Sequence, residues 1–131
     1  MDIEITSFGY LHGAPPAAHL TLDLRHHFRD PHVSPELRNL TAEDAAVREA
    51  VLNTPGIATL IVAAEMAVRA FEMGPSKGTI RVAVGCAGGR HRAATVAQTL
   101  ASRLGPAAQA ALVHRDLSKD VVNRDENGNR S

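Results

Sequence analysis

TIRVAVGCAGGRHRAATVAQTLASRLGP, residues 79–106, is the stretch that decides the fold. Apolar residues alternate with other residues over positions 80–84, as they do in a β-strand. From Ala93 onward, apolar residues recur at intervals of three and four, which predicts a helix that stops at Gly105 and Pro106. Three glycines lie between the strand and the helix. The sequence therefore predicts a strand, a glycine loop (residues 85–91) and a helix, in that order.

The glycine loop has the features of an anion-binding site. A loop between the carboxyl end of a strand and the amino end of a helix directs free N–H groups and the positive end of the helix dipole at one spot. Arg90, His91 and Arg92 lie at the same place. Two cations at a helix amino end oppose the dipole, and an anion between them would remove that conflict. We expect a phosphate site here; the alternative is a tight turn followed by a solvated helix start.

Bulk composition limits the classes of function. The chain has 131 residues, 44% of them hydrophobic, which suits one soluble domain with a real core. Its 14 basic and 14 acidic residues cancel, so no global field favours nucleic acid or an anionic membrane. A single cysteine excludes a disulfide within the chain and fits a reducing cytoplasm. The longest apolar run, residues 57–64, is too short to span a bilayer, and Met1-Asp2-Ile3-Glu4 is not the start of a signal peptide.

The rest of the chain alternates strands with helices. We expect the sheet to be mixed but mostly parallel, because strands separated by helices are normally parallel whereas the first two strands lie close enough in sequence to pair antiparallel. The prediction is one α/β domain over residues 1–116, followed by a polar, disordered tail over residues 117–131. The expected strands are Ile3–Tyr10, Leu20–Arg25 and Ala110–Asp116, and the expected helices are Ala42–Leu52 and Pro55–Met73.

Capping and burial are predicted for these two helices and for one strand. Thr41 with Asp44 resembles a capping box for the first helix. Pro55 is expected at the first position of the second helix, which is apolar around most of its circumference and should be largely buried. Asp23 is expected to be buried within its strand and to need Arg25 as a partner.

Histidines outside the glycine loop are the other candidate site residues. His12 follows a strand end, where α/β proteins collect ligands, although it could equally be an exposed loop residue. His26, His27 and His32 belong to an irregular segment, residues 26–40. Adjacent histidines rarely bind one ion, so a metal site is not expected. A long loop folded over the glycine loop is favoured, with His32 and Arg38 facing the ligand.

The glycine segment also carries a family resemblance. VAVGCAGGRHRAATVAQTLASRL resembles the signature of the carboxyl-terminal domain of RapZ, the bacterial RNase adapter family, and SFGYLHGAP and LDLRHHFRDPHVSPELRNLTAEDAAV are similar to its other motifs. The resemblance covers about Ile5 to Arg115. It implies an α/β fold like a phosphofructokinase subdomain, binding of glucosamine-6-phosphate, contacts to a small regulatory RNA, recruitment of a ribonuclease, and self-association into a homo-oligomer. No further cofactor is implied.

The family pocket can be carried over only to matching positions. With the anion argument above, it gives the candidate ligand-binding set His12, His32, Arg38, Cys86, Ala87, Gly88, Gly89, Arg90, His91 and Arg92. Three features depart from the family. The chain has no GxxxxGK[ST] motif, so it should not bind ATP through a Walker loop. Leu11 replaces a lysine, and the basic tail is diluted by Asp116, Asp120, Asp125 and Glu126, which makes RNA binding the least secure expectation.

A phosphatase is the alternative from the enzyme class. Cys86 and Arg92 have the C-x5-R spacing with which tyrosine-phosphatase-like loops wrap a phosphate around a thiolate. Gly85 and Ala93 do not match such loops, and no obvious aspartate loop supplies a general acid, although Asp30 could be proposed. The sequence therefore favours a ligand-sensing module that catalyses nothing, with a buried structural cysteine under the loop.

Overall fold

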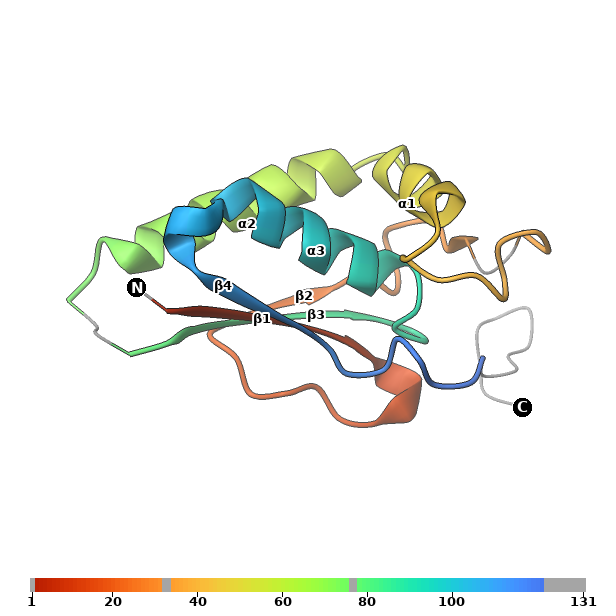
Figure 1. Ribbon diagram of the computed structural model, residues 1–131, viewed down its shortest axis with the longest axis horizontal. Helices are drawn as coiled ribbons and strands as arrows, with labels where there is room; N and C mark the ends of the chain where they lie inside the picture. Colours follow the sequence, from red (N-terminus) through yellow and green to blue (C-terminus); the bar gives the residue numbers. More distant parts are fainter. Residues whose placement is uncertain (1, 32–33, 76–77, 122–131) are drawn as a thin grey trace.

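The computed structural model describes residues 2–31, 34–75 and 78–121, which form one α/β layer pair (Figure 1). A four-stranded sheet has the order β2-β3-β1-β4, and every neighbouring pair is parallel. The α/β class expected from the sequence is confirmed. The strands are β1 (Ile3–Gly9), β2 (Leu20–Asp23), β3 (Ile80–Cys86) and β4 (Ala110–His114).

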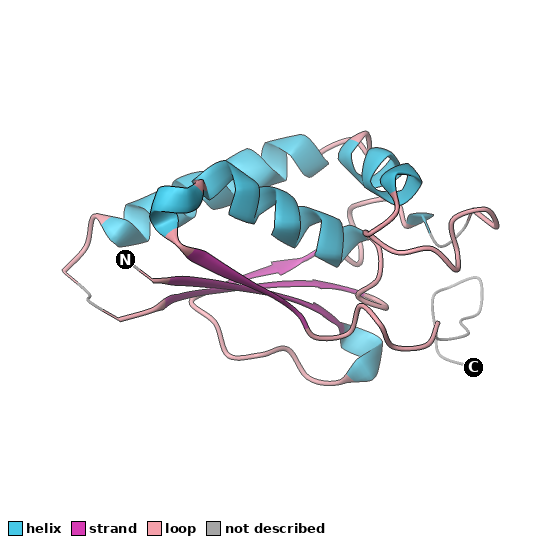
Figure 2. Ribbon diagram, viewed as in Figure 1, coloured by secondary structure: helices cyan, strands magenta, loops and turns pink. Residues whose placement is uncertain are grey.

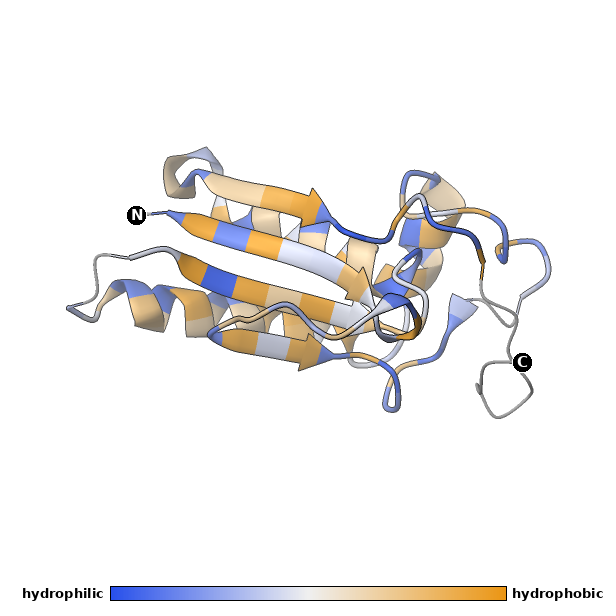
Figure 3. Cartoon of the chain, turned by 90° about the horizontal axis from the view of Figure 1, so that it is seen from below, coloured by the Kyte–Doolittle hydropathy of each residue, from blue (hydrophilic) through white to orange (hydrophobic). Residues whose placement is uncertain are grey.

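The first two strands do not pair with each other, because β3 lies between them. The connection from β1 begins with the 3-10 helix η1 (Tyr10–His12) and then crosses the face of the sheet opposite the helices (Figures 1 and 3). It returns to the end of the sheet at which β1 and β3 begin, where the His19 N–H donates to the Arg81 carbonyl at 2.9 Å. Because β2 starts from that end of the sheet, it runs parallel to β3. The antiparallel pair that would make the sheet mixed is therefore not formed.

The described α-helices all pack on one face of the sheet, opposite the face on which η1 lies (Figure 2). They are α1 (Ala45–Leu52), α2 (Ile57–Glu72) and α3 (Arg92–Leu104), with the 3-10 helix η3 (Pro106–Ala108) before β4. Alternate residues of β1 and β3 face these helices, and they form the core together with the apolar stripe of α3. Fully buried core side chains include Ile5, Val82, Val84, Val96 and Leu100.

The helix starts differ from the predictions in detail. Asp44 is the N-cap residue of α1, so the helix begins after the expected Ala42. Thr41 and Asp44 do interact, since the Thr41 N–H donates to the Asp44 carboxylate at 2.9 Å, but this closes a turn before the helix. Gly56, with a φ of 92°, precedes the first residue of α2, so Pro55 lies outside the helix.

Helix α2 is not largely buried, contrary to the prediction from its composition. It buries the single stripe Ile57, Ile61, Ala64 and Val68, while Met66 on the opposite side is 67% exposed. The sheet has helices on one face in a single layer, so α2 has nothing described on its outer side (Figure 1). None of the described helices is by itself long and apolar enough to cross a membrane. Helices α1 and α2 have the length and composition of a membrane span only when they are taken together, and the two are bent by 84° relative to each other.

Candidate functional site

The carboxyl ends of β1 and β3 lie side by side, with Gly9 paired to Cys86. The connection that follows β1 leaves toward the face opposite the α-helices, and the one that follows β3 leads to α3 on the other face (Figure 1). This divergence is a topological switch point, the place where open α/β sheets bind their ligands. The glycine loop and η1 therefore meet where this fold class places a site.

Close backbone packing joins the two loops. A Cβ on Gly9 would lie 2.4 Å from the Gly88 carbonyl carbon, and one on Gly89 would lie 2.8 Å from the Gly9 nitrogen. Gly89 also has a φ of 81°, which side chains rarely adopt. The Leu11 N–H donates to the Ala87 carbonyl at 3.0 Å, which sets η1 and its partly buried His12 against the glycine loop.

Cys86 supports the loop from beneath. Its Sγ accepts hydrogen bonds from the Gly89 N–H and the Ala93 N–H, both at 3.3 Å, and the residue is 3% exposed. The sulfur thus satisfies one N–H of the glycine loop, at Gly89, and one of the N–H groups that the start of α3 leaves open, at Ala93. This burial agrees with a structural cysteine more closely than with an accessible nucleophile.

Two N–H groups of the glycine loop, just before α3, remain available. Within the part of the chain that the structure describes, the backbone N–H groups of Gly88 and Arg90 donate no hydrogen bond. A Cβ added at Gly88 would meet no atom within 4 Å, so the space above it is open. The loop leads directly into the amino end of α3, where the positive end of the helix dipole lies. Together these features can hold an anion.

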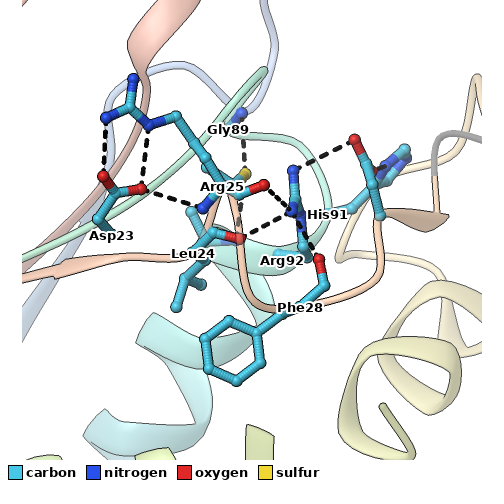
Figure 4. A network of polar contacts seen from close by, with 10 residues as sticks. Asp23, Leu24, Arg25, Phe28, Gly89, His91 and Arg92 are labelled. Atoms are coloured by element: carbon cyan, nitrogen blue, oxygen red, sulfur yellow. Dashed lines mark hydrogen bonds and ion pairs between the residues drawn. The ribbon is translucent and has the colours of Figure 1, made fainter. Parts of the chain in front are cut away.

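Arg92 is buried and already engaged (Figure 4). Its Nη1 donates to the carbonyls of Leu24 at 2.7 Å and of Phe28 at 3.0 Å, and its Nη2 pairs with the Asp30 carboxylate at 3.2 Å. The guanidinium therefore fixes the segment after β2 against the amino end of α3. In this arrangement Arg92 positions the loops, and most of its donors are not directed at open space.

His91, the N-cap residue of α3, has a similar role. Its Nε2–H donates to the Leu40 carbonyl at 2.8 Å, and its Nδ1 lies 4.0 Å from an Asp30 oxygen. The imidazole is 4% exposed. Through these contacts, His91 and Arg92 hold the segment of residues 26–40 against the glycine loop. The sequence analysis predicted that this segment folds over the loop.

Arg90 bridges two further segments. Its Nη1 donates to the Lys119 carbonyl at 2.7 Å and its Nη2 to the Asn39 carbonyl at 3.0 Å. Arg38, beside Asn39, is exposed. His32 lies outside the described residues, so its predicted position facing the ligand stays a prediction.

Asp116 is the residue that sequence reasoning missed. It is fully buried and accepts from the Gly9 N–H at 2.7 Å, and it pairs with Arg115 at 3.0 Å and Lys119 at 2.6 Å. Burial acts to raise the pKa of Asp116, but the hydrogen bonds from Arg115, Gly9 and Lys119 outweigh it and leave that pKa below its ordinary value. In the sequence Asp116 looked like one more acid that dilutes the tail, because nothing local marks it as buried.

A second acid lies on the strand edge beside the site. Asp23 accepts two hydrogen bonds from the Arg25 side chain, at 3.0 and 2.7 Å, which lower the pKa of Asp23 to about 2. The expected partner is therefore correct, but the expected burial is wrong, because the Asp23 side chain is 36% exposed. The Arg25 guanidinium also lies 3.6 Å from the centre of the Tyr10 ring, so both groups are held at the edge of η1.

The histidine segment forms no metal site in the described ranges, where no three histidine, cysteine or carboxylate residues gather. His26 and His27 are both exposed.

Known proteins are similar to this chain along most of its length. The family model for the RapZ C-terminal domain matches residues 1–118. Curated relatives include proteins named nucleotide-binding protein from Thermobifida fusca, 38% identical over 121 residues, and from Rubrobacter xylanophilus, 39% identical over 126 residues. Each match covers 89% of this chain and 41% of the relative. The chain thus spans about two fifths of the length of these relatives.

Proposed function

Because the chain belongs to the RapZ C-terminal domain family, we propose that it is an adapter module that binds a phosphorylated small molecule at the glycine loop. Glucosamine-6-phosphate is the ligand we propose first, from the family resemblance. The observation that carries the proposal is that the N–H groups of Gly88 and Arg90, just before α3, donate no hydrogen bond within the described residues, and that the space where a Gly88 Cβ would lie is open. His12, His32 and Arg38 are the side chains proposed to contact the rest of the ligand.

Magnitudes indicate how such a site would reach useful affinity. A helix amino end contributes about 0.3–1 kcal/mol toward an anion, whereas micromolar binding needs about 8 kcal/mol. Charge-assisted hydrogen bonds contribute about 1.5–3 kcal/mol each. The backbone at Gly88 therefore selects the position of the phosphate, and cationic side chains have to supply much of the binding energy.

Alanine at Gly88 is expected to weaken binding of glucosamine-6-phosphate about tenfold, since a methyl group beside an open N–H costs about one such hydrogen bond. Calorimetry on the wild type and on Gly88→Ala, with glucosamine-6-phosphate, inorganic phosphate and ATP, measures the difference in affinity. Gly74→Ala is the matched control, because Gly74 follows α2 at the other end of the molecule and a Cβ there meets only the Phe71 carbonyl at 3.4 Å. Absence of heat with every anion would refute the proposed function.

RNA and a ribonuclease are proposed partners from the family, and the tail limits the RNA contribution. Arg115 and Lys119 both pair with Asp116, so one of the two positive charges that they bring to the carboxyl-terminal region is already offset. If the protein contacts about three RNA phosphates, the logarithm of the binding constant should fall with the logarithm of the salt concentration with a slope near −2 to −3. We expect at best micromolar affinity for structured RNA in about 150 mM salt, measured by gel shift across a salt series. A complex that survives high salt would contradict this.

The C-x5-R phosphatase is the second candidate, and the two N–H groups that face the Cys86 sulfur are the observation in its favour. The sulfur is buried, however, and the Arg92 guanidinium holds carbonyls rather than an open phosphate position. We expect hydrolysis of a chromogenic aryl phosphate at pH 5–7 to equal the blank for both the wild type and Cys86→Ser. A rate above the blank that disappears in Cys86→Ser would establish the enzyme instead.

A further inference from the structure

The cations around the site differ in their partners. Arg25 pairs with a carboxylate at 2.7 Å, Arg92 at 3.2 Å, Arg115 at 3.0 Å and Lys119 at 2.6 Å. Arg90 forms no ion pair with any residue that the structure describes. It is held by neutral carbonyls instead, so no described carboxylate pairs with its charge, whereas Arg115 and Lys119 share the single charge of Asp116.

The carbonyls that hold Arg90 belong to segments far apart in the sequence. One is Lys119, in the C-terminal segment (residues 115–121), and the other is Asn39, in the turn before α1. The Arg90 Nε is buried and has no acceptor. A guanidinium has five N–H donors in a fixed fork, so Arg90 crosslinks three segments while part of its donor capacity is unused.

We propose, building on the proposed phosphate site, that Arg90 couples anion binding to release of the C-terminal segment. A phosphate held at the N–H groups of Gly88 and Arg90 would bind the backbone of the same residue whose guanidinium holds Asn39 and Lys119. Charge-assisted hydrogen bonds to phosphate are roughly twice as strong as bonds to neutral acceptors. The guanidinium therefore exchanges the carbonyls of Asn39 and Lys119 for the anion, and these two carbonyls lose their shared donor.

The release is confined to the residues after Asp116. Asp116 itself stays anchored, because it is fully buried and holds the Gly9 N–H. Beyond it, the described contacts of the exposed Lys119 are the bond from Arg90, its ion pair with Asp116 and its own N–H donated to the Asp116 carbonyl at 3.2 Å. Loss of one of these three leaves a short exposed turn with low local stability. By linkage, the ordered C-terminal segment in turn weakens anion binding.

Hydrogen exchange on the full chain tests the coupling, read at the Lys119 amide and across residues 117–121. In the wild type, glucosamine-6-phosphate or inorganic phosphate at saturation is expected to accelerate this exchange several-fold. Arg90→Ala is expected to exchange rapidly without ligand, to show no further change with ligand, and to bind about 10- to 100-fold more weakly by calorimetry. Arg103→Ala is the matched control, because Arg103 pairs with Glu65 away from the site and should behave as the wild type.

The two proposals fail in distinguishable ways. If calorimetry shows binding but exchange over residues 117–121 does not change, the coupling is wrong and the phosphate site stands. If no anion binds, the proposed function fails and the coupling with it. Wild-type affinity in Arg90→Ala also overturns the role of Arg90. Should Arg90→Ala not fold, Arg90→Lys keeps the charge but not the fork, and it is expected to exchange faster than the wild type without ligand.

Discussion

Alanine in place of Gly9 is expected to lower the free energy of unfolding by about 3 kcal/mol, at the upper end of the cost of overpacking. The backbone of Gly9, with φ −114° and ψ 126°, suits any residue, so the cost is steric alone. The added Cβ would lie 2.4 Å from the Gly88 carbonyl carbon and 2.9 Å from the Ala87 oxygen, both of them backbone atoms that cannot rotate away. Relief requires the two loops of the site to separate, so anion affinity should fall as well.

Urea denaturation followed by circular dichroism measures this change, with Gly88→Ala as the matched control. No atom lies within 4 Å of a Cβ at Gly88, so that variant should stay within about 0.5 kcal/mol of the wild type. The pair thus separates folding from binding, since Gly9→Ala loses both and Gly88→Ala loses affinity only. Equal stabilities for the two variants would mean that the Gly9 contact does not hold the loops together.

Removal of the Asp116 carboxylate has the second large effect. Asp116→Ala is expected to lower the free energy of unfolding by about 3 kcal/mol, because a fully buried acceptor disappears and leaves Arg115, Lys119 and the Gly9 N–H without it. This loss of stability is at the low end of the cost of breaking a buried ion pair, because the side chains of Arg115 and Lys119 both keep some contact with water. Asp120→Ala is the control in the same segment, as Asp120 is exposed and should change stability by less than about 0.5 kcal/mol.

The pH dependence of stability gives Asp116 a separate readout. The native pKa of Asp116 lies below its ordinary value of 3.8, so the unfolded chain binds a proton that the folded chain does not between these two values. The contribution of Asp116 is therefore complete above pH 3.8 and is lost as the pH falls through the native pKa. Wild-type stability minus that of Asp116→Ala, measured by urea denaturation from pH 6 to pH 2, should shrink in this window. A constant difference would contradict the ion pair.

Local patterns in the sequence were enough to predict the strand, loop and helix around residues 79–106. They also predicted that His12 follows a strand end, and in the structure it lies in η1, which is held against the glycine loop. The partners of Arg92 could not be predicted in this way. Its acceptors are the carbonyls of Leu24 and Phe28, and every residue type carries such a group.

Burial was the other limit of the sequence analysis. Helix α2 appeared to be a core helix from its apolar content, but a single layer of helices leaves Met66 exposed. Asp116 appeared to be a surface acid, yet it is fully buried because Arg115, Lys119 and the Gly9 N–H meet around it. Both errors depend on which segments pack together, and composition within one segment does not carry that information.

The central place of β1 in the sheet has a consequence for how the chain acquires its structure. Ile3 pairs with Ile80 on one side and with Ala110 on the other, so the first strand made has no partner until most of the chain exists. A polypeptide emerging from a ribosome would carry β1 unpaired through the synthesis of α1 and α2. Closing such long loops costs entropy before any contact repays it, which makes folding slow and late. Truncation before β3 should therefore leave an unpaired apolar strand that is prone to aggregate, and not a smaller folded domain.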